Sequence, residues 1–279
     1  MCKIRLVGID MDGTLLSTDK TISPYTMEIL KEVHRSGVEI VIATGRPYLA
    51  IKDLQKELPF LRYFLSSNGA RVMDAQGDKT LIEALLPREK GMEALKLLGE
   101  YDAITEAYFD GLGYIAQKDY DRIELFHKNP NMVKYFKKTR KAIPDLLAHI
   151  ETESRDMDKC QALFHDMLAR KEAWARLEVL GGLALVNSLD YNIEINHFEV
   201  NKGTSLIKLA GLLGFEGAEV MAIGDNDNDK AMLEMAGLGV AMANSVPEIL
   251  GLADYVTTSN DEEGVALALK KFILEDKPC

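Results

Sequence analysis

The most informative part of this sequence, for both fold and chemistry, is the stretch Val7-Gly8-Ile9-Asp10-Met11-Asp12-Gly13-Thr14. Its first residues belong to a mostly apolar run from Ile4 to Ile9, which is typical of a buried strand. The run delivers two carboxylates, separated by one residue, to the point where a glycine breaks the strand. Carboxylates this close repel each other, so one pKa rises unless a cation lies between them. The stretch therefore indicates a metal-assisted reaction at Asp10 and Asp12.

Composition and charge restrict the class of protein. Of the 279 residues, 47% are hydrophobic and 28% are charged, which is ordinary for a globular chain of one large or two modest domains. The net charge of −11 argues against a nucleic-acid partner. It does not exclude a small anionic substrate, because local cations decide what a cleft binds. No feature of the sequence indicates an oligomeric state.

The sequence contains no sign of export or membrane insertion. No apolar run approaches the roughly 18 residues of a membrane span, and the first residues lack the apolar core of a signal peptide. The three cysteines, Cys2, Cys160 and Cys279, have no metal-binding or redox spacing and are expected to be free thiols. We therefore expect a cytoplasmic protein without a membrane partner.

Strands and helices alternate at both ends of the chain. Near the start, apolar runs predict strands over 3–9, 38–43 and 63–66, with helices over 24–36 and 47–57 between them. This βαβαβ order predicts a parallel sheet with right-handed crossovers. Alternation resumes after Tyr191–Ile195 and continues to the last helix, over 262–274. The predicted fold class is α/β, with a Rossmann-like parallel sheet as its core.

The middle of the chain has a different pattern. From about Ala70 a hairpin over 71–85 is followed by a mixture of helices and strands without regular alternation. We expect a discontinuous core of residues 1–84 and 190–279 and an inserted α+β domain over 85–189.

Four motifs in the core segments carry chemical groups, and three of them follow predicted strands. They are Asp10-x-Asp12-Gly13-Thr14, Ile42-Ala43-Thr44-Gly45-Arg46, Asn201-Lys202-Gly203 and Gly224-Asp225-Asn226-Asp227-Asn228-Asp229. The carboxyl ends of parallel strands converge on one crevice, so these motifs can meet although they are far apart in the sequence.

The residue types of the motifs suit phosphoryl transfer. Carboxylates hold Mg²⁺, a carboxylate nucleophile can accept a phosphoryl group, and a neighbouring acid can move the protons. A hydroxyl and free backbone N–H groups at Thr44-Gly45 can bind phosphoryl oxygens. A lysine offsets the negative charge that gathers in the transition state.

The four motifs, in this order, resemble those of the haloacid dehalogenase superfamily. The long insertion between the second and third motifs resembles the cap of its C2-capped, Cof-type phosphatases, as do Ala241-Met242-Ala243-Asn244 and Glu263-Gly264-Val265-Ala266. The likeness covers essentially the whole chain. It implies a core of this family with an inserted α+β cap domain that acts as a lid, and a cap region between about Ala103 and Ser188 that sets specificity.

The resemblance also implies roles for individual residues. Asp10 would be the nucleophile and Asp12 the general acid and base, and Lys202 would steady both the nucleophile and the phosphate. An acid at position 12 favours phosphatase over dehalogenase chemistry.

The remaining roles concern the metal and the substrate. Asp225 would ligate Mg²⁺ together with the Asp10 carboxylate and the Asp12 backbone carbonyl, and Asp229 would support the metal shell. Thr44 would bind the phosphoryl group and Asn228 would lie near the substrate. Arg46 would contact the phosphate or the cap, or only brace its loop.

The motifs also resemble structural elements without catalytic function. Asp225-x-Asp227-x-Asp229 opens like an EF-hand loop, but Lys230 and Ala236 stand where the glycine and the bidentate glutamate are required. Taken singly, most of these motifs are more typical of an ordinary turn or helix start than of a catalytic site. Four of them in this order are not typical of ordinary turns.

The sequence thus predicts a Mg²⁺-dependent phosphatase that hydrolyses small phosphorylated metabolites, sugar phosphates by resemblance, through an aspartyl-phosphate. A phosphotransferase or phosphomutase on the same fold, or a non-catalytic metal- or phosphate-binding regulator, remains as an alternative.

Overall fold

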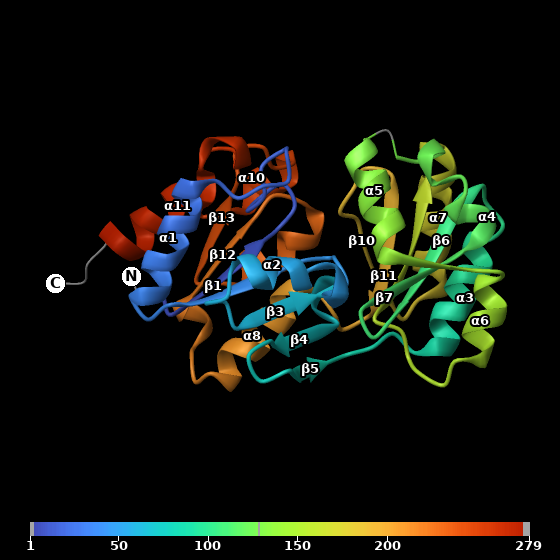
Figure 1. Ribbon diagram of the computed structural model, residues 1–279, viewed down its shortest axis with the longest axis horizontal. Helices are drawn as coiled ribbons and strands as arrows, with labels where there is room; N and C mark the ends of the chain where they lie inside the picture. The colour runs from blue at the N-terminus through green and yellow to red at the C-terminus, as the bar shows by residue number, and fades with distance from the viewer. Residues whose placement is uncertain (1–2, 128, 276–279) are drawn as a thin grey trace. The chain divides into compact units, whose positions relative to one another are not determined.

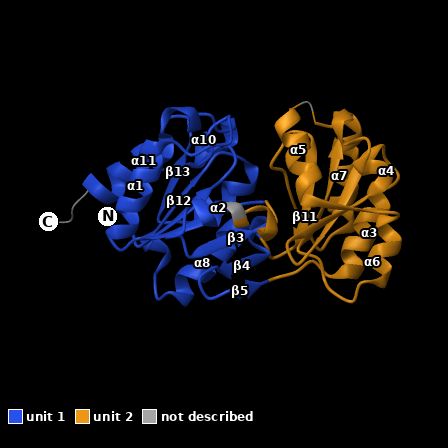
Figure 2. Ribbon diagram, viewed as in Figure 1, with its two compact units in different colours: residues 1–45, 53–83, 201–279 blue, residues 46–52, 84–200 orange. Residues whose placement is uncertain are grey.

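The computed structural model describes residues 3–127 and 129–275, which form two compact units (Figure 2). Unit 1 spans residues 1–45, 53–83 and 201–279, and unit 2 spans residues 46–52 and 84–200. Unit 1 is therefore built from segments on both sides of the longer segment of unit 2.

Unit 1 contains an eight-stranded sheet in the order β14-β13-β12-β1-β2-β3-β4-β5 (Figure 1). Neighbouring strands from β14 to β3 are parallel, and β4 and β5 extend the sheet as antiparallel strands. The strands are β1 (Leu6–Asp10), β2 (Glu39–Ala43), β3 (Tyr63–Ser66), β4 (Arg71–Asp74), β5 (Lys79–Glu83), β12 (Val220–Gly224), β13 (Leu238–Ala241) and β14 (Tyr255–Val256). The helices of this part of the chain are α1 (Pro24–Arg35), α2 (Lys52–Glu57), α8 (Lys202–Leu212), α9 (Lys230–Met235), α10 (Pro247–Leu252) and α11 (Gly264–Leu269).

The central strands of this sheet are covered on both faces. Every residue of β1 and of β12 is buried, as expected for a parallel sheet with helices on both sides. Helix α1 packs against α11 and helix α8 against α9. Helix α8 begins with a capping box, in which the Asn201 side chain accepts from the Thr204 amide. This cap fixes the start of α8, and with it the position of Lys202.

Unit 2 contains a six-stranded sheet in the order β10-β11-β9-β6-β7-β8 (Figure 1). All its pairs are antiparallel except β7 with β8. The strands are β6 (Ala103–Phe109), β7 (Leu112–Ala116), β8 (Arg140–Ile143), β9 (Lys159–Phe164), β10 (Leu183–Val186) and β11 (Asn192–His197). The helices are α3 (Arg88–Leu98), α4 (Gln117–Tyr120), α5 (Pro130–Thr139), α6 (Leu146–Thr152) and α7 (Met167–Leu180).

The predicted fold class is confirmed, since a parallel α/β core is interrupted by an α+β insertion. The bounds of the compact units differ from the predicted division into 1–84, 85–189 and 190–279. Strand β11 pairs with β9 and β10, so unit 2 extends to Val200. Residues 46–52 also join unit 2, where the ideal Cβ of Gly111 would lie 3.1 Å from the Leu49 backbone. The assignment of the two parts as catalytic core and cap stays a prediction.

Two further predictions concern the membrane and the cysteines. Within the described residues, no helix is both long and apolar enough to cross a membrane. Cys160 is a buried free thiol whose pKa is raised by burial to about 12. Cys2 and Cys279 lie outside the described residues.

Candidate active site

The carboxyl ends of four adjacent strands carry the polar groups of unit 1. In sheet order these strands are β12, β1, β2 and β3. Asp10 ends β1, Thr44 follows β2 and Asp225 follows β12. Asn68 follows β3 two residues after its end. The sheet therefore brings together residues that are up to about two hundred positions apart, as the convergence rule for parallel strands predicts.

A buried lysine links two of the predicted carboxylates. Lys202 is fully buried, and its Nζ lies 2.5 Å from Asp10 Oδ1 and 2.6 Å from Asp229 Oδ1. Asp10 and Asp229 are buried as well. Gly203 lets α8 approach α9 closely, since an added Cβ would lie only 2.3 Å from the Ala231 carbonyl oxygen. The close contact of these two helices holds the ammonium group beside both carboxylates.

Asp229 also organises the loop after β12. Its Oδ2 accepts hydrogen bonds from the Asp225 and Asn226 amides, at 3.0 and 3.1 Å. Both oxygens of Asp229 are therefore engaged by donors of this chain. The Asp229 side chain fixes the position of Asp225 relative to Lys202.

Residues of the loop after β1 fix the position of the Asp225 side chain. The Thr14 hydroxyl donates to Asp225 Oδ1 at 2.6 Å. Gly13 has a φ of +90°, and an added Cβ would lie 2.5 Å from Asp225 Oδ2. Both the left-handed conformation and the close approach require glycine here, which explains why the loop after Asp12 carries one.

The charge of Asp229 opposes ionisation of the two neighbouring carboxyl groups, those of Asp10 and Asp225. Burial raises the pKa of Asp10 well above its usual range, and the Asp229 charge adds to this, while Lys202 acts in the opposite direction. Burial and the Asp229 charge raise the pKa of Asp225 to about 7, against the hydrogen bond from Thr14. Burial alone would lower the pKa of Lys202, but Asp10 and Asp229 outweigh it and raise this pKa.

The cluster could hold a divalent cation. Asp10, Asp225 and Asp229 each offer a carboxylate oxygen, and these oxygens lie within 4.8 Å of one another. If all three are ionised, the ammonium of Lys202 leaves a formal charge of −2 in a buried site. An all-oxygen donor set with this excess charge fits a hard cation such as Mg²⁺ or Ca²⁺.

Asp12 is placed differently from Asp10. Its side chain is 34% exposed and its Oδ1 accepts a hydrogen bond from Lys20 Nζ at 2.8 Å. Lys20 was not singled out by the sequence, because a lysine in a polar loop carries no distinguishing signal. The Asp12 carboxyl is thus the member of the pair that solvent can reach.

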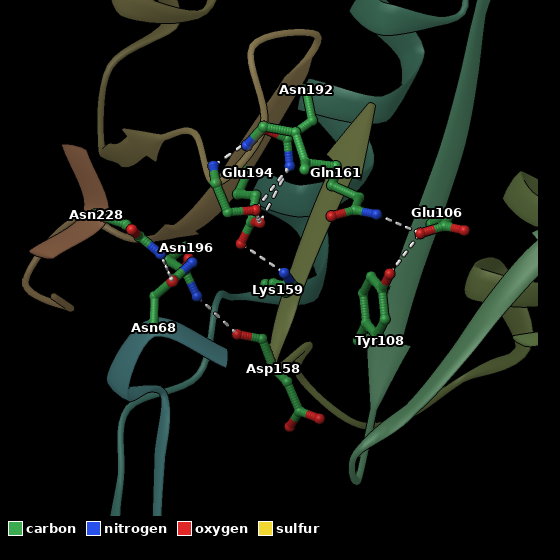
Figure 3. Close-up of polar contacts among 12 residues, drawn as sticks. Asn68, Glu106, Tyr108, Asp158, Lys159, Gln161, Asn192, Glu194, Asn196 and Asn228 are labelled. Carbon is green, nitrogen blue, oxygen red and sulfur yellow. Dashed lines mark hydrogen bonds and ion pairs between the residues drawn. The ribbon is translucent and has the colours of Figure 1, made fainter. Parts of the chain in front are cut away.

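Asn68 lies among the candidate site residues, although none of the four sequence motifs contains it. Its side chain is buried, and its Oδ1 accepts a hydrogen bond from Asn228 Nδ2 at 3.2 Å (Figure 3). Its backbone amide donates to the Thr44 carbonyl oxygen at 3.1 Å. The predicted substrate-binding residues Thr44 and Asn228 are therefore joined through Asn68. The position of Asn68 after a parallel strand was the signal that could have found it.

Arg46 and Gly45 mark the boundary between the units. Gly45 is the last residue of its segment in unit 1, and Arg46 belongs to unit 2. There the guanidinium carbon of Arg46 lies 4.5 Å from the centre of the Tyr135 ring, a cation–π contact. Tyr135 lies in the segment predicted as the cap, and which of the three roles Arg46 has stays a prediction.

Unit 2 contains a second group of buried polar side chains. They alternate along β6, β9 and β11 and so share one face of the sheet, which we call the polar face (Figure 3). Its members are Glu106, Tyr108, Lys159, Gln161, Asn192, Glu194 and Asn196.

The polar face is closely connected. Lys159 Nζ lies 2.5 Å from Glu194 Oε2, and Gln161 Nε2 donates to Glu106 Oε2. Arg140 Nε lies 3.2 Å from Glu106 Oε1, so the carboxylates and the cations balance.

Comparison with known proteins gives consistent matches. The family model described as haloacid dehalogenase-like hydrolase matches residues 7–269. The Bacillus subtilis (strain 168) protein YxeH is 34% identical over 280 residues, which cover 97% of this chain and 98% of that protein. The 5-amino-6-(5-phospho-D-ribitylamino)uracil phosphatase YcsE of the same organism is 30% identical over 276 residues, covering 97% of this chain and 96% of that protein. A solved structure described as a haloacid dehalogenase-like hydrolase from B. subtilis has a TM-score of 0.88 at 28% identity, covering 97% of this chain and 100% of that one.

Proposed function

Because the chain belongs to the haloacid dehalogenase-like hydrolase family and is a phosphatase of small phosphorylated compounds, we propose that it works through Mg²⁺ and a phosphorylated Asp10. The observation that carries this proposal is the position of Asp10. Its carboxylate ends the central strand β1, contacts Lys202 and lies within reach of two further carboxylates.

Asp10 and Asp225 would hold the metal, with the Asp12 backbone carbonyl as a third protein ligand. We propose that Asp229 supports these ligands and does not bind the metal itself, because its two oxygens already accept hydrogen bonds from Lys202 and from two backbone amides. Mg²⁺ bound there would offset the charge of the phosphoryl oxygens. The excess negative charge of the cluster and the raised pKa values of Asp10 and Asp225 support a cation at this place.

In the first half-reaction, a carboxylate oxygen of Asp10 forms a bond to phosphorus while the bond from phosphorus to the leaving oxygen breaks. Asp12 donates its proton to that leaving oxygen, which departs as an alcohol. Lys202 Nζ stays beside Asp10 and neutralises charge on the phosphoryl group. Thr44, the Gly45 backbone and Asn228 would bind the phosphoryl oxygens and the adjoining part of the substrate.

In the second half-reaction, water attacks phosphorus and the bond between phosphorus and Asp10 breaks. Asp12, now ionised, takes a proton from the water, so inorganic phosphate leaves and both aspartates return to their starting states. Asp12 suits this role because its side chain is partly exposed and can exchange protons with solvent. Arg46 would brace its own loop through its contact with Tyr135.

We propose sugar phosphates as the substrate class. We infer that the polar face of unit 2 takes part in recognition. Its side chains are buried and paired with one another so that positive and negative charges balance, which suits a neutral, hydroxyl-rich group better than a charged one. Because a whole buried ion pair can often be replaced by well-packed apolar residues without loss of stability, stability alone does not explain why this face is polar. The same face accommodates apolar side chains elsewhere, such as Ile104 and Leu163. Polar residues kept in such a place point to recognition.

The test of the reaction is phosphate release over a panel of phosphorylated sugars, nucleotides and cofactors, with Mg²⁺ or with EDTA. We expect Asp10→Asn to abolish release and the exposed Asp19→Asn to retain it. Acid quenching during turnover should trap phosphate on the wild type and not on Asp10→Asn. Wild-type turnover by Asp10→Asn would refute the mechanism. Added acceptor sugars separate hydrolysis from transfer, and the hydrolase family favours hydrolysis.

The test of the substrate class compares two substrates in each variant. We expect Glu194→Gln to lower kcat/KM for the preferred sugar phosphate at least tenfold relative to kcat/KM for p-nitrophenyl phosphate, whose leaving group has no hydroxyl chain. Asp119→Asn neutralises another buried carboxylate of unit 2 that lies outside the polar face, and serves as the matched control. An unchanged ratio in Glu194→Gln would remove the polar face from substrate recognition.

A further inference from the structure

The turn after β3, Ser66-Ser67-Asn68-Gly69, has three successive residues with positive φ. The angles are 49° at Ser67, 59° at Asn68 and 103° at Gly69. Glycine adopts this region freely and asparagine tolerates it, whereas serine does so at a cost. A turn of this kind persists where surrounding contacts fix it, and such turns cluster at functional sites.

Asn68 connects the loops that follow β2 and β12. On one side its backbone amide donates to the Thr44 carbonyl oxygen at 3.1 Å. On the other side its Oδ1 accepts from Asn228 Nδ2 at 3.2 Å (Figure 3). The left-handed conformation allows one residue to serve both loops, because it turns the amide and the side chain of Asn68 away from the course of β3.

The same turn is fixed to helix α8. The Ser205 hydroxyl donates to the Gly69 carbonyl oxygen at 2.8 Å. An added Cβ at Gly69 would lie 2.6 Å from Ser205 Oγ and 2.8 Å from the Asn201 carbonyl oxygen. Asn201 and Ser205 flank the first turn of the helix that begins with Lys202. The turn is thus anchored against the element that carries the buried ammonium group.

We propose that Asn68 is a positioning residue of the phosphatase reaction, which holds Thr44 and Asn228 at the spacing that phosphoryl binding requires. The inference rests on the proposed function, because it assigns Asn68 to the reaction of that site. Asn68 acts through its two partners, and its loss leaves the carboxylates and Lys202 in place. Substrate affinity should therefore suffer more than the chemical step.

Three variants separate the side chain from the backbone. Asn68→Gly keeps the left-handed conformation and removes the hydrogen bond to Asn228. Asn68→Asp keeps the acceptor and tolerates the conformation. Asn68→Ala loses the acceptor and also strains the backbone, so only this variant should clearly lower the urea midpoint of unfolding.

The kinetic readouts use p-nitrophenyl phosphate as substrate and inorganic phosphate as inhibitor. We expect Asn68→Gly to raise KM and the inhibition constant of phosphate roughly fivefold to tenfold, the loss typical of one hydrogen bond, with less than a threefold change in kcat. The Asn68→Asp variant isolates the acceptor. Its KM should lie between those of wild type and Asn68→Gly, because the new charge repels phosphate.

A double-mutant cycle with Asn228→Ala tests the connection itself. If Asn68 acts through Asn228, the double variant Asn68→Gly/Asn228→Ala should lose little more affinity for phosphate than Asn228→Ala alone. Additive losses, or a fall in kcat with unchanged KM, would overturn the inference. A wild-type protein that fails to release phosphate from any substrate would instead contradict the proposed function, so the two failures can be told apart.

Discussion

Replacing Lys202 by methionine tests the charge balance of the buried site. The substitution keeps an unbranched side chain of similar length and removes the ammonium that lies 2.5 Å from Asp10 and 2.6 Å from Asp229. Asp229 retains its two backbone donors after the substitution. Burial already raises the pKa of Asp10, and loss of the ammonium removes the charge that lowers it, so Asp10 is expected to take up a proton.

That proton uptake limits the loss of stability and makes it depend on pH. An aspartate in the unfolded chain has a pKa of about 3.9, and each unit between this value and the pH costs about 1.4 kcal/mol of protonation free energy. The loss in free energy of unfolding is therefore at most about 4 kcal/mol at pH 7 and about 1.5 kcal/mol at pH 5. The sign follows because the native variant binds a proton that the unfolded chain has released, so its stability falls as the pH rises.

The measurement is urea unfolding in EDTA at pH 5 and pH 7, followed by circular dichroism. The only tryptophan, Trp174, lies in unit 2, and its fluorescence reports that unit separately. Lys20→Met is the matched control, because the Lys20–Asp12 pair is about one third exposed and should contribute no more than about 1 kcal/mol. A destabilisation by Lys202→Met that is equal at both pH values, or larger at pH 5, would refute the reasoning. The variant should also lose about a hundredfold or more in kcat.

Three other predictions concern metal, packing and pH. Mg²⁺ should raise the thermal midpoint of unit 1, and Asp225→Asn should remove most of that shift in a thermal scan. Gly203→Ala should cost about 1–3 kcal/mol in urea unfolding because its Cβ would meet the Ala231 carbonyl, whereas Gly211→Ala, with open space in the same helix, should be neutral or stabilising. Burial lowers the pKa of His127 from 6.5 to about 4, so the unfolded chain binds the proton more readily and unit 2 should lose stability as the pH falls through this range. His127→Phe should flatten that dependence in Trp174 fluorescence, and an unchanged slope would count against it.

Much of the fold could be predicted from apolar periodicity. The strand over 63–66 has the bounds that the sequence predicts, and the helix predicted over 24–36 ends one residue earlier, at Arg35. Strand β8 was missed, because Arg140–Ile143 begins with two charged residues and joins the edge of its sheet beside β7. The second core segment was predicted to begin at residue 190, about ten residues before Asn201, where unit 1 resumes. The reason is that an alternating strand such as β11 has the same sequence pattern in either sheet.

The candidate site, like the fold, could be predicted only in part from the sequence. Asp10, Lys202, Asp225 and Asp229 come together as the motifs and the convergence of parallel strands predict. Their catalytic roles stay predictions. Asn68 carries no reactive group, and its importance appears only through Thr44 and Asn228.

The sequence did not predict the polar face, for a different reason. In β6, β9 and β11 polar residues alternate with apolar ones, which is usually read as a strand with one face in water. These polar residues are nevertheless almost completely buried. Only tertiary structure distinguishes a solvated face from a buried polar network.

The pairing of β1 with β12 has a consequence for how the chain is made. Thr14 and Asp225, which meet beside these strands, are 211 residues apart. On the ribosome, β1 to β3 emerge long before their central neighbour, and the 84–200 segment of unit 2 is complete first. During that interval the apolar edge of β1 lacks its partner strand, a condition that favours pairing with other chains. Because β12 is made late, we expect nascent chains, rather than finished ones, to be the form of this protein that is most prone to aggregate.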